Sequence, residues 1–393
     1  MKTICRRTLG RLVAGSALAV AGFGVAGFGG PAFADPPALR IGVTISTTGQ
    51  GAALGIPEKN TLDVIAREIG GTRLEIIQLD DAGDPTNATT NARRLATEDK
   101  VDVLIGSSVT PATIAVANVA FESAVPHFAL SPMAFQPGRD TWTFVMPQPV
   151  PLMAKGLFEN MTAKGVKTVG IIGFSDSWGD LWVKEFKASG EPMGLKMVAD
   201  ERYARADTSV AGQVLKLLAA KPDAVLVGAS GTAAALPVIA LRQRGYTGPI
   251  YQTHGAVTRD FIRIAGKAAE GVIFVSGPVI AAAKQPDDAL TKAPGVAYTA
   301  AYEAKFGPGT ITQFGAHMYD VFELLKRAVP VALKSAEPGT QAFRDALRDA
   351  LESEKEMAAS QAVYSYGPGN HYGVDGRGRI LVTVKDGDWA IVQ

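Results

Sequence analysis

Short apolar runs rich in valine and isoleucine recur along the chain with helical stretches between them, and this alternation restricts the fold more than any other feature. The runs are continuous rather than alternating apolar with polar, which is typical of parallel strands covered by helices on both faces. The order of strand, helix and strand predicts an α/β protein built from doubly wound parallel sheets. The candidate strands are 39–45, 74–79, 101–105, 127–130, 143–145, 168–172, 196–199, 224–227, 250–251, 271–275 and 380–384.

Capping residues and prolines mark the starts of three early helices. Asp84-Pro85 predicts a helix to about residue 98, Thr110-Pro111 one to about residue 121, and Pro57 one to about residue 69. Helical stretches are also expected at 179–188, 210–220, 232–244, 296–305, 315–329 and 341–355.

The number of strands favours two lobes over one sheet. Roughly five strand–helix units precede the proline-rich segment 147–151, and the same rhythm restarts at Lys167. Open sheets rarely exceed about ten strands, so we expect two lobes joined near these prolines.

Residues 1–34 carry the pattern of a cleaved secretory signal peptide. Basic residues come first, an apolar stretch follows from 12 to 28, and Ala32-Phe33-Ala34 matches a signal-peptidase site. A membrane anchor is the less favoured alternative, and Arg6-Arg7 leaves both the general and the twin-arginine export routes open. The single cysteine, Cys5, lies in this segment, so the mature chain is expected to have no disulfide and to reside in a bacterial periplasm.

Composition and motifs argue against several classes of function. The balance of 39 basic and 38 acidic residues gives no reason to expect nucleic acid or an anionic membrane as a partner. Four histidines are scattered without metal-ligand spacing, and no nucleophile motif or Walker loop occurs. The Gly-x-Gly-x-x-Gly at 22–27 follows no predicted strand, and Asp80-Asp81 is interpreted as a solvated turn. We therefore expect no metal, no cofactor and no catalysis.

Loops after three strands of the first half are rich in hydroxyl groups and glycine. They cover 46–55, 106–111 and 131–135. Ligands in open α/β sheets lie beyond the carboxyl ends of strands, where short hydroxyl side chains and helix amides suit a carboxylate. The alternative is that each serine or threonine caps its own helix, which is the preferred interpretation for Thr110 taken alone.

The corresponding loops of the second half are 175–179, 228–231 and 253–255. They carry larger side chains, of which Trp178 is the most informative. We interpret it as an apolar wall for a ring or alkyl group. The alternative is packing against Leu181 or Trp182. Under the first interpretation, Trp178→Ala weakens binding and leaves the fold intact.

These stretches resemble the type I periplasmic substrate-binding proteins of ABC importers, in the branched-chain amino-acid (leucine-binding) family, and 54–60 is closest to its aromatic-acid-binding branch. The matching segments are 40–49, 51–60, 79–85, 101–106, 125–127, 131–132, 221–225 and 319–320. The resemblance implies two lobes joined by three crossovers, near 145–150, 275–279 and 329–335. Lobe 1 would then comprise 35–148 and 276–332, and lobe 2 would comprise 149–275 and 333–393.

The resemblance also implies which residues hold the ligand. The family's carboxylate-binding positions fall on Ser107, Ser108, Thr110, Met133 and Phe135, its ammonium-binding acid on His254, and its second-lobe aromatic contacts on Trp178 and Ser230. Where the family usually has threonine and an acid, this chain has Phe135 and His254. A buried ammonium without its carboxylate would bind poorly, so these departures weaken the amino-acid interpretation.

We therefore expect a periplasmic solute-binding component of an ABC importer that captures a small carboxylate, with an aromatic or branched monocarboxylic acid favoured. The anion is assigned to the hydroxyl loops, including Ser131. Leu54, Phe135 and Trp178 form apolar walls, while Ser230 and His254 close from lobe 2. The expected partners are the ligand and an inner-membrane ABC permease, with the protein a monomer. The alternatives are an amino-acid-binding protein, a periplasmic sensor subunit of a signalling receptor, and a hydrolase, for which the sequence offers no nucleophile.

Overall fold

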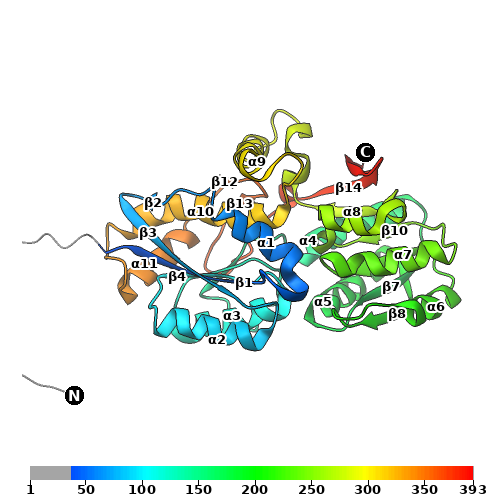
Figure 1. The fold of residues 1–393 in the computed structure, drawn as a ribbon, viewed down its shortest axis with the longest axis horizontal. Helices are drawn as coiled ribbons and strands as arrows, with labels where there is room; N and C mark the ends of the chain where they lie inside the picture. The colour runs from blue at the N-terminus through cyan, green and yellow to red at the C-terminus, as the bar shows by residue number, and fades with distance from the viewer. Residues whose placement is uncertain (1–36, 393) are drawn as a thin grey trace, which may run out of the picture. The chain divides into compact units, whose positions relative to one another are not determined.

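Two separate parallel-dominated sheets organise the chain, and the predicted α/β class is confirmed. The computed structural model describes residues 37–392, so the predicted signal peptide lies outside the described residues. Lobe 1 is built on a six-stranded sheet and lobe 2 on a seven-stranded sheet (Figure 1). Within residues 37–392, every helix is too short or too polar to cross a lipid bilayer.

The sheet of lobe 1 has the order β2-β3-β1-β4-β5-β6 and is parallel except for the β2–β3 hairpin. Helices α2 and α3 pack on one face, and α10 and α11 pack on the other (Figure 1). The strands are β1 (Leu39–Ile45), β2 (Glu68–Ile69), β3 (Thr72–Asp80), β4 (Val103–Gly106), β5 (His127–Ala129) and β6 (Thr143–Val145). The helices are α1 (Ala52–Thr61), α2 (Pro85–Thr97), α3 (Thr110–Ser123), α10 (Gln313–Ala332) and α11 (Gln341–Glu352).

The sheet of lobe 2 has the order β15-β14-β11-β10-β9-β7-β8, with β14 antiparallel to both of its neighbours. Its strands are β7 (Thr168–Phe174), β8 (Lys196–Tyr203), β9 (Ala224–Gly228), β10 (Ile250–Gln252), β11 (Ile273–Ser276), β14 (Ile380–Lys385) and β15 (Asp388–Ile391). Its helices are α4 (Val150–Ala163), α5 (Ser177–Glu185), α6 (Ala211–Ala219), α7 (Ala235–Gln243) and α8 (Arg259–Ala265).

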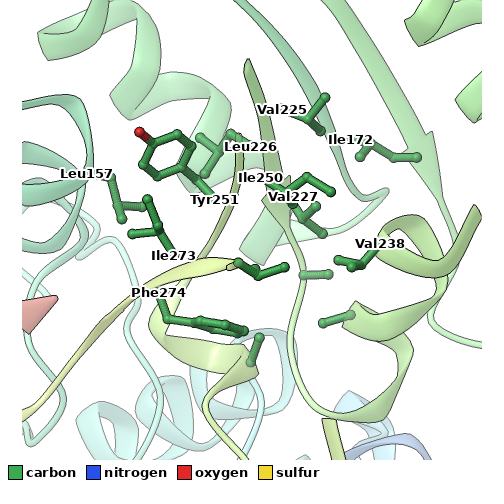
Figure 2. Packing of buried hydrophobic residues seen from close by; sticks show 14 of the residues in the cluster. Leu157, Ile172, Val225, Leu226, Val227, Val238, Ile250, Tyr251, Ile273 and Phe274 are labelled. Atoms are coloured by element: carbon green, nitrogen blue, oxygen red, sulfur yellow. The ribbon is translucent and has the colours of Figure 1, made fainter. Parts of the chain in front are cut away.

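The centre of lobe 2 explains why its strands are continuous apolar runs. Leu226 and Val227 on β9 and Phe274 on β11 are fully buried between helices on the two faces (Figure 2). Burying a side chain of this size contributes about 1.5–3 kcal/mol relative to leaving it exposed. Parallel strands covered on both sides therefore carry no polar stripe, which is the pattern in the sequence.

The first helix departs from its prediction at both ends. The structure starts α1 at Ala52, after a 3₁₀ turn at Gly49–Gly51, and ends it at Thr61, so Pro57 lies inside the helix rather than at its start. Glycine allows this early start, because a Cβ on Gly55 would come within 2.1 Å of the carbonyl oxygen of Ser46. The α1 helix consequently passes very close to the loop that follows β1.

The third crossover also lies elsewhere than predicted. The segment after α10 was expected to belong to lobe 2, but α11 and the small hairpin of β12 (Met357–Ala358) and β13 (Val363–Tyr364) pack into the core of lobe 1. Phe343 and Leu347 on one face of α11 are fully buried there. The chain reaches lobe 2 only between Val374 and Ile380, where β14 begins.

Asp320 on α10 fastens this late segment to lobe 1. Its carboxylate accepts hydrogen bonds from the backbone amides of Ser360 and Gln361, at 2.9 Å each, and from the Ser360 hydroxyl at 2.6 Å. All of these groups are buried, so each would lose its partner if the carboxylate were removed. Helix α9 (Lys292–Phe306) is attached separately, through Tyr298 and the Thr61 hydroxyl, 2.8 Å apart.

Removing the Asp320 carboxylate should destabilise the protein markedly. We expect Asp320→Ala to lower the free energy of unfolding by about 2–4 kcal/mol, because several buried donors lose their acceptor. The matched control Asp288→Ala changes an exposed aspartate and should stay within about 0.5 kcal/mol of wild type. Urea denaturation measures both, and equal stabilities for the two variants would contradict the assignment.

Candidate ligand-binding site

A cavity lies where loops from the carboxyl ends of strands in both sheets meet. About 340 Å³ of space there is not filled by protein atoms, and part of it is open to solvent. The lining residues are Leu54, Ser108, Val109, Thr110, Leu130, Ser131, Pro132, Pro147, Trp178, Arg205, Ser230, His254, Gly255, Phe314 and His317. Lobe 1 and lobe 2 both contribute.

The amino end of α3 forms one side of the cavity. Val109 is the N-cap, and no side chain caps the helix. The Thr110 hydroxyl was expected to do so, but it donates to the carbonyl of Pro132 and lies 2.9 Å from the Ser131 hydroxyl. The first-turn amides of an uncapped helix end favour an anion.

Behind this helix end, buried acids order the loop after β1. Asp81 is fully buried and accepts from the hydroxyls of Thr44 and Ser46, so it is not the solvated turn residue that was predicted. The Ser108 hydroxyl accepts from the backbone amide of Ser46 at 3.0 Å and lies 2.5 Å from Oε2 of Glu58. Glu58 is also fully buried, and this burial raises the pKa of its carboxyl well above the usual value.

Arg205 enters the cavity from lobe 2, directly after β8. Its Nε donates to Asp176 at 2.6 Å and its Nη1 donates to the Ser230 hydroxyl at 3.0 Å, while the guanidinium lies 4.2 Å from the ring centroid of Phe174. Asp176 also accepts from the amides of Trp178 and Gly179 at the start of α5, so its charge is shared between the helix end and Arg205. The guanidinium is thus held rigidly, with donors left over.

Three buried side chains of the cavity carry polar atoms without a hydrogen-bond partner. The unpaired atoms are Nδ1 and Nε2 of His254, Nδ1 of His317 and Nε1 of Trp178, and each of the three residues is at most 2% exposed. Burial lowers the pKa of both histidines to about 3, so their rings are neutral near pH 7. Unpaired buried donors and acceptors are costly, so a polar ligand in the cavity would stabilise them.

The lining contains no aspartate or glutamate, and Arg205 is its only charged residue. Elsewhere in residues 37–392, no cluster of histidine, cysteine and acidic residues has the makings of a metal site. The lining therefore offers a cation and apolar surface but no acidic side chain to pair with an ammonium group.

The structure brings seven of the predicted site residues to the cavity wall: Leu54, Ser108, Thr110, Ser131, Trp178, Ser230 and His254. Trp178 combines both interpretations weighed for it. It lines the cavity and also packs edge-on against Trp182, with ring centroids 5.9 Å apart, in the core of lobe 2.

Three predicted residues lie outside the cavity lining. Ser107 is buried behind it. Met133 and Phe135 were expected to form part of the site, but they line a neighbouring hollow with Tyr372. The physical reason is that the Tyr372 hydroxyl bonds both the amide and the carbonyl of Met133, which turns the chain away after Pro132.

Sequence reasoning missed Arg205, Phe314, His317 and, behind the wall, Glu58. Arg205 was missed because the predicted strand 196–199 ended four residues before the true end of β8, so the arginine was not recognised as a residue at a strand's carboxyl end. Phe314 and His317 lie in the first turns of α10, where the Thr312 hydroxyl caps the helix. The sequence signal that could have identified these two residues was the capped start of a helix with a histidine in its second turn.

The chain belongs to the periplasmic binding protein family, whose model, described as "Periplasmic binding protein", matches residues 38–379. Members of this family are solute-binding proteins and not enzymes. An extracellular ligand-binding receptor from Rhodopseudomonas palustris HaA2 is 60% identical, with a TM-score of 0.90 over 91% of this chain and 100% of its own.

Two more distant proteins have names that mention a ligand. An "Amino acid binding protein" of Pseudomonas aeruginosa is 25% identical over 259 residues, and the matched region spans 60% of this chain and 66% of that relative. A solute-binding protein of an ABC transporter from R. palustris, solved with benzoate, is 20% identical, with a TM-score of 0.75 over 91% of this chain and 96% of its own. At this identity the likeness shows the shared type I fold.

The neutral state of His254 predicts a specific pH dependence. The folded protein keeps this ring neutral down to about pH 3, whereas the unfolded chain protonates it below about pH 6.5. The unfolded state therefore binds more protons between these values, and the free energy of unfolding should fall as the pH drops through this window.

The free energy of unfolding should depend less steeply on pH in His254→Gln than in wild type. The difference in slope should be up to about 1.4 kcal/mol per pH unit, which corresponds to one proton. Urea denaturation of wild type and variant from about pH 4.5 to about pH 7 measures the difference. Identical slopes would show that the His254 ring is protonated in the folded protein.

Proposed function

We propose that this protein captures a small carboxylic acid without an amino group, with an aromatic acid favoured, as the periplasmic solute-binding component of an ABC importer. The observation that carries the proposal is the charge pattern of the cavity wall, where Arg205 is the single charged side chain and no acid is present. An α-amino acid would bring an ammonium group into this cavity without a carboxylate to pair with it, which is costly.

The shape of the wall supports an apolar body next to the anionic group. Leu54 and Phe314 from lobe 1 and Trp178 from lobe 2 are nearly fully buried around the cavity. Aromatic surfaces of this kind suit a flat ring, with edge-on or offset contacts. The benzoate complex of the R. palustris solute-binding protein supports an aromatic acid as a ligand that the fold can accommodate.

Because both lobes would contact the ligand, binding would favour one arrangement of the lobes, and a partner protein could recognise that arrangement. A ligand held by Arg205 of lobe 2 and by the α3 end of lobe 1 favours whichever arrangement brings both groups onto it at once. A permease in the inner membrane would then recognise the liganded arrangement. The membership of the periplasmic binding protein family supports this role.

Amino-acid binding is the second candidate, because the P. aeruginosa relative is named for it. Under that function, an acidic side chain would have to face the ligand nitrogen. Glu58 is separated from the cavity by Ser108, and Asp176 is already bonded to Arg205. The wall as described favours the acid without an amine.

A thermal-shift panel distinguishes the two candidates by matched ligands. Benzoate, 4-hydroxybenzoate and 4-methyl-2-oxopentanoate carry the carboxylate alone, benzamide lacks the charge, and phenylalanine and leucine add the ammonium group. A ligand at about 100 times its Kd should stabilise the protein by about 2.7 kcal/mol. We expect this from at least one member of the first group. A shift with leucine or phenylalanine alone would establish the amino-acid function instead.

Arg205 should contribute most of the discrimination for charge. We expect Arg205→Met to weaken binding of the active acid by about 1.5–3 kcal/mol, the range for hydrogen bonds to charged groups, without a comparable loss of fold stability. Isothermal titration calorimetry measures the affinity, with Arg263→Met as the control, because Arg263 is exposed and pairs only with Asp260 on its own helix. Equal affinities for Arg205→Met and the control would rule out this role.

A further inference from the structure

Glu58 is a fully buried acid directly behind the cavity wall. It lies on α1, and its Oε2 is 2.5 Å from the hydroxyl of Ser108, which lines the cavity. The close approach depends on Gly55, because a Cβ there would meet both Ser46 and the Ser108 hydroxyl. Among the described residues, Glu58 forms no ion pair, and its second oxygen, Oε1, has no hydrogen-bond partner.

Burial favours the neutral form of Glu58 and outweighs the Ser108 hydroxyl, which as a donor would lower the pKa of the carboxyl. Asp81, in the loop after β3, is the acidic neighbour, and its negative charge disfavours a second one nearby. His317 and His254, on other parts of the cavity wall, are neutral and supply no positive charge. An ionised carboxylate with one oxygen buried and unbonded would be costly, while a neutral acid leaves only a carbonyl oxygen unpaired.

Counting hydrogens at Ser108 shows what a neutral Glu58 does there. A hydroxyl has one hydrogen to donate and two lone pairs that accept. One lone pair of Ser108 accepts the backbone N–H of Ser46 at 3.0 Å. A protonated Glu58 donates its own hydrogen to the second lone pair. The hydrogen of Ser108 then has no acceptor on this side and is directed to the cavity.

We propose that Glu58 is a positioning residue that, as a neutral acid, donates to Ser108 and so turns the Ser108 hydroxyl hydrogen toward an oxygen of the bound ligand. The inference rests on the proposed function, since it assigns that oxygen to the ligand's carboxylate. If Glu58 ionised, Ser108 would donate to Glu58 instead, and the cavity would lose a donor and gain a nearby negative charge. Ligand affinity is therefore linked to one buried proton.

The protonation state of Glu58 is measurable without any ligand. In protein labelled with ¹³C at the glutamate carboxyl carbons, the Glu58 resonance is identified by its loss in Glu58→Gln. The exposed Glu68 serves as the matched control through Glu68→Gln. We expect the Glu58 signal to report a neutral acid at about pH 7 and to differ from the Glu68 signal. An ionised Glu58 at that pH overturns the proposal, whatever the ligand is.

The ligand arm uses benzoate, or the acid of the panel that binds most tightly, from about pH 5 to about pH 9. Glu58→Gln keeps an N–H donor for Ser108 and should bind like wild type below the pH at which Glu58 ionises. Above that pH, wild type should weaken and Glu58→Gln should not. If ionisation is not reached in this range, the two should bind alike throughout.

Ser108→Ala completes the test, because it removes the positioned hydroxyl. It should weaken binding roughly tenfold to a hundredfold in both the wild-type and the Glu58→Gln backgrounds. Unchanged affinity in Ser108→Ala, or wild type weakening with pH in parallel with Glu58→Gln, would refute the inference. If no acid of the panel binds, the proposed function fails, and the ligand-free resonance measurement still decides the state of Glu58.

Discussion

The guanidinium of Arg205 is oriented by lobe 2 alone, and the character of the whole cavity depends on this arrangement. Asp176 fixes one edge of the group, the Ser230 hydroxyl fixes another, and Phe174 supports its face. Because Asp176 also caps α5, its charge is divided, and the guanidinium retains part of its attraction for an anion. A cation held in place in advance loses little entropy when a ligand arrives, so the site is preorganised.

The hydroxyl groups around the cavity act mainly by supporting the wall. Thr110 and Ser131 bond to each other, Thr110 also donates to the carbonyl of Pro132, and Ser230 accepts from Arg205. Under the proposed function, we expect direct ligand contacts from groups with unused hydrogen-bonding capacity: the guanidinium, the α3 amides, Ser108 and the unpaired nitrogens of His254, His317 and Trp178. All of these except Arg205 are neutral, so the one charged side chain of the wall is the guanidinium, which pairs with the half-buried Asp176 outside the lining.

The fold was largely predictable from the sequence, because runs such as 39–45 and 224–227 are buried, mostly apolar strands with helical stretches between them. The position of the third crossover was not predictable, because α11 is equally amphipathic whichever lobe covers its apolar face. The expectation that ligand-binding residues follow the carboxyl ends of strands identified Ser108, Trp178 and His254. The same expectation failed for Arg205, because the predicted end of β8 was misplaced, and for Phe135, because a hydrogen bond to Tyr372 redirects the loop. Such contacts join residues far apart in sequence and leave no local signal.

We expect the cavity to accept an acid that has no amino group. Mass spectrometry of the small molecules released from the purified protein tests it most directly, because it requires no guess about the ligand. The account predicts a carboxylic acid without an amine, present in proportion to the protein and absent from the Arg205→Met variant. An α-amino acid released in the same proportion would contradict it.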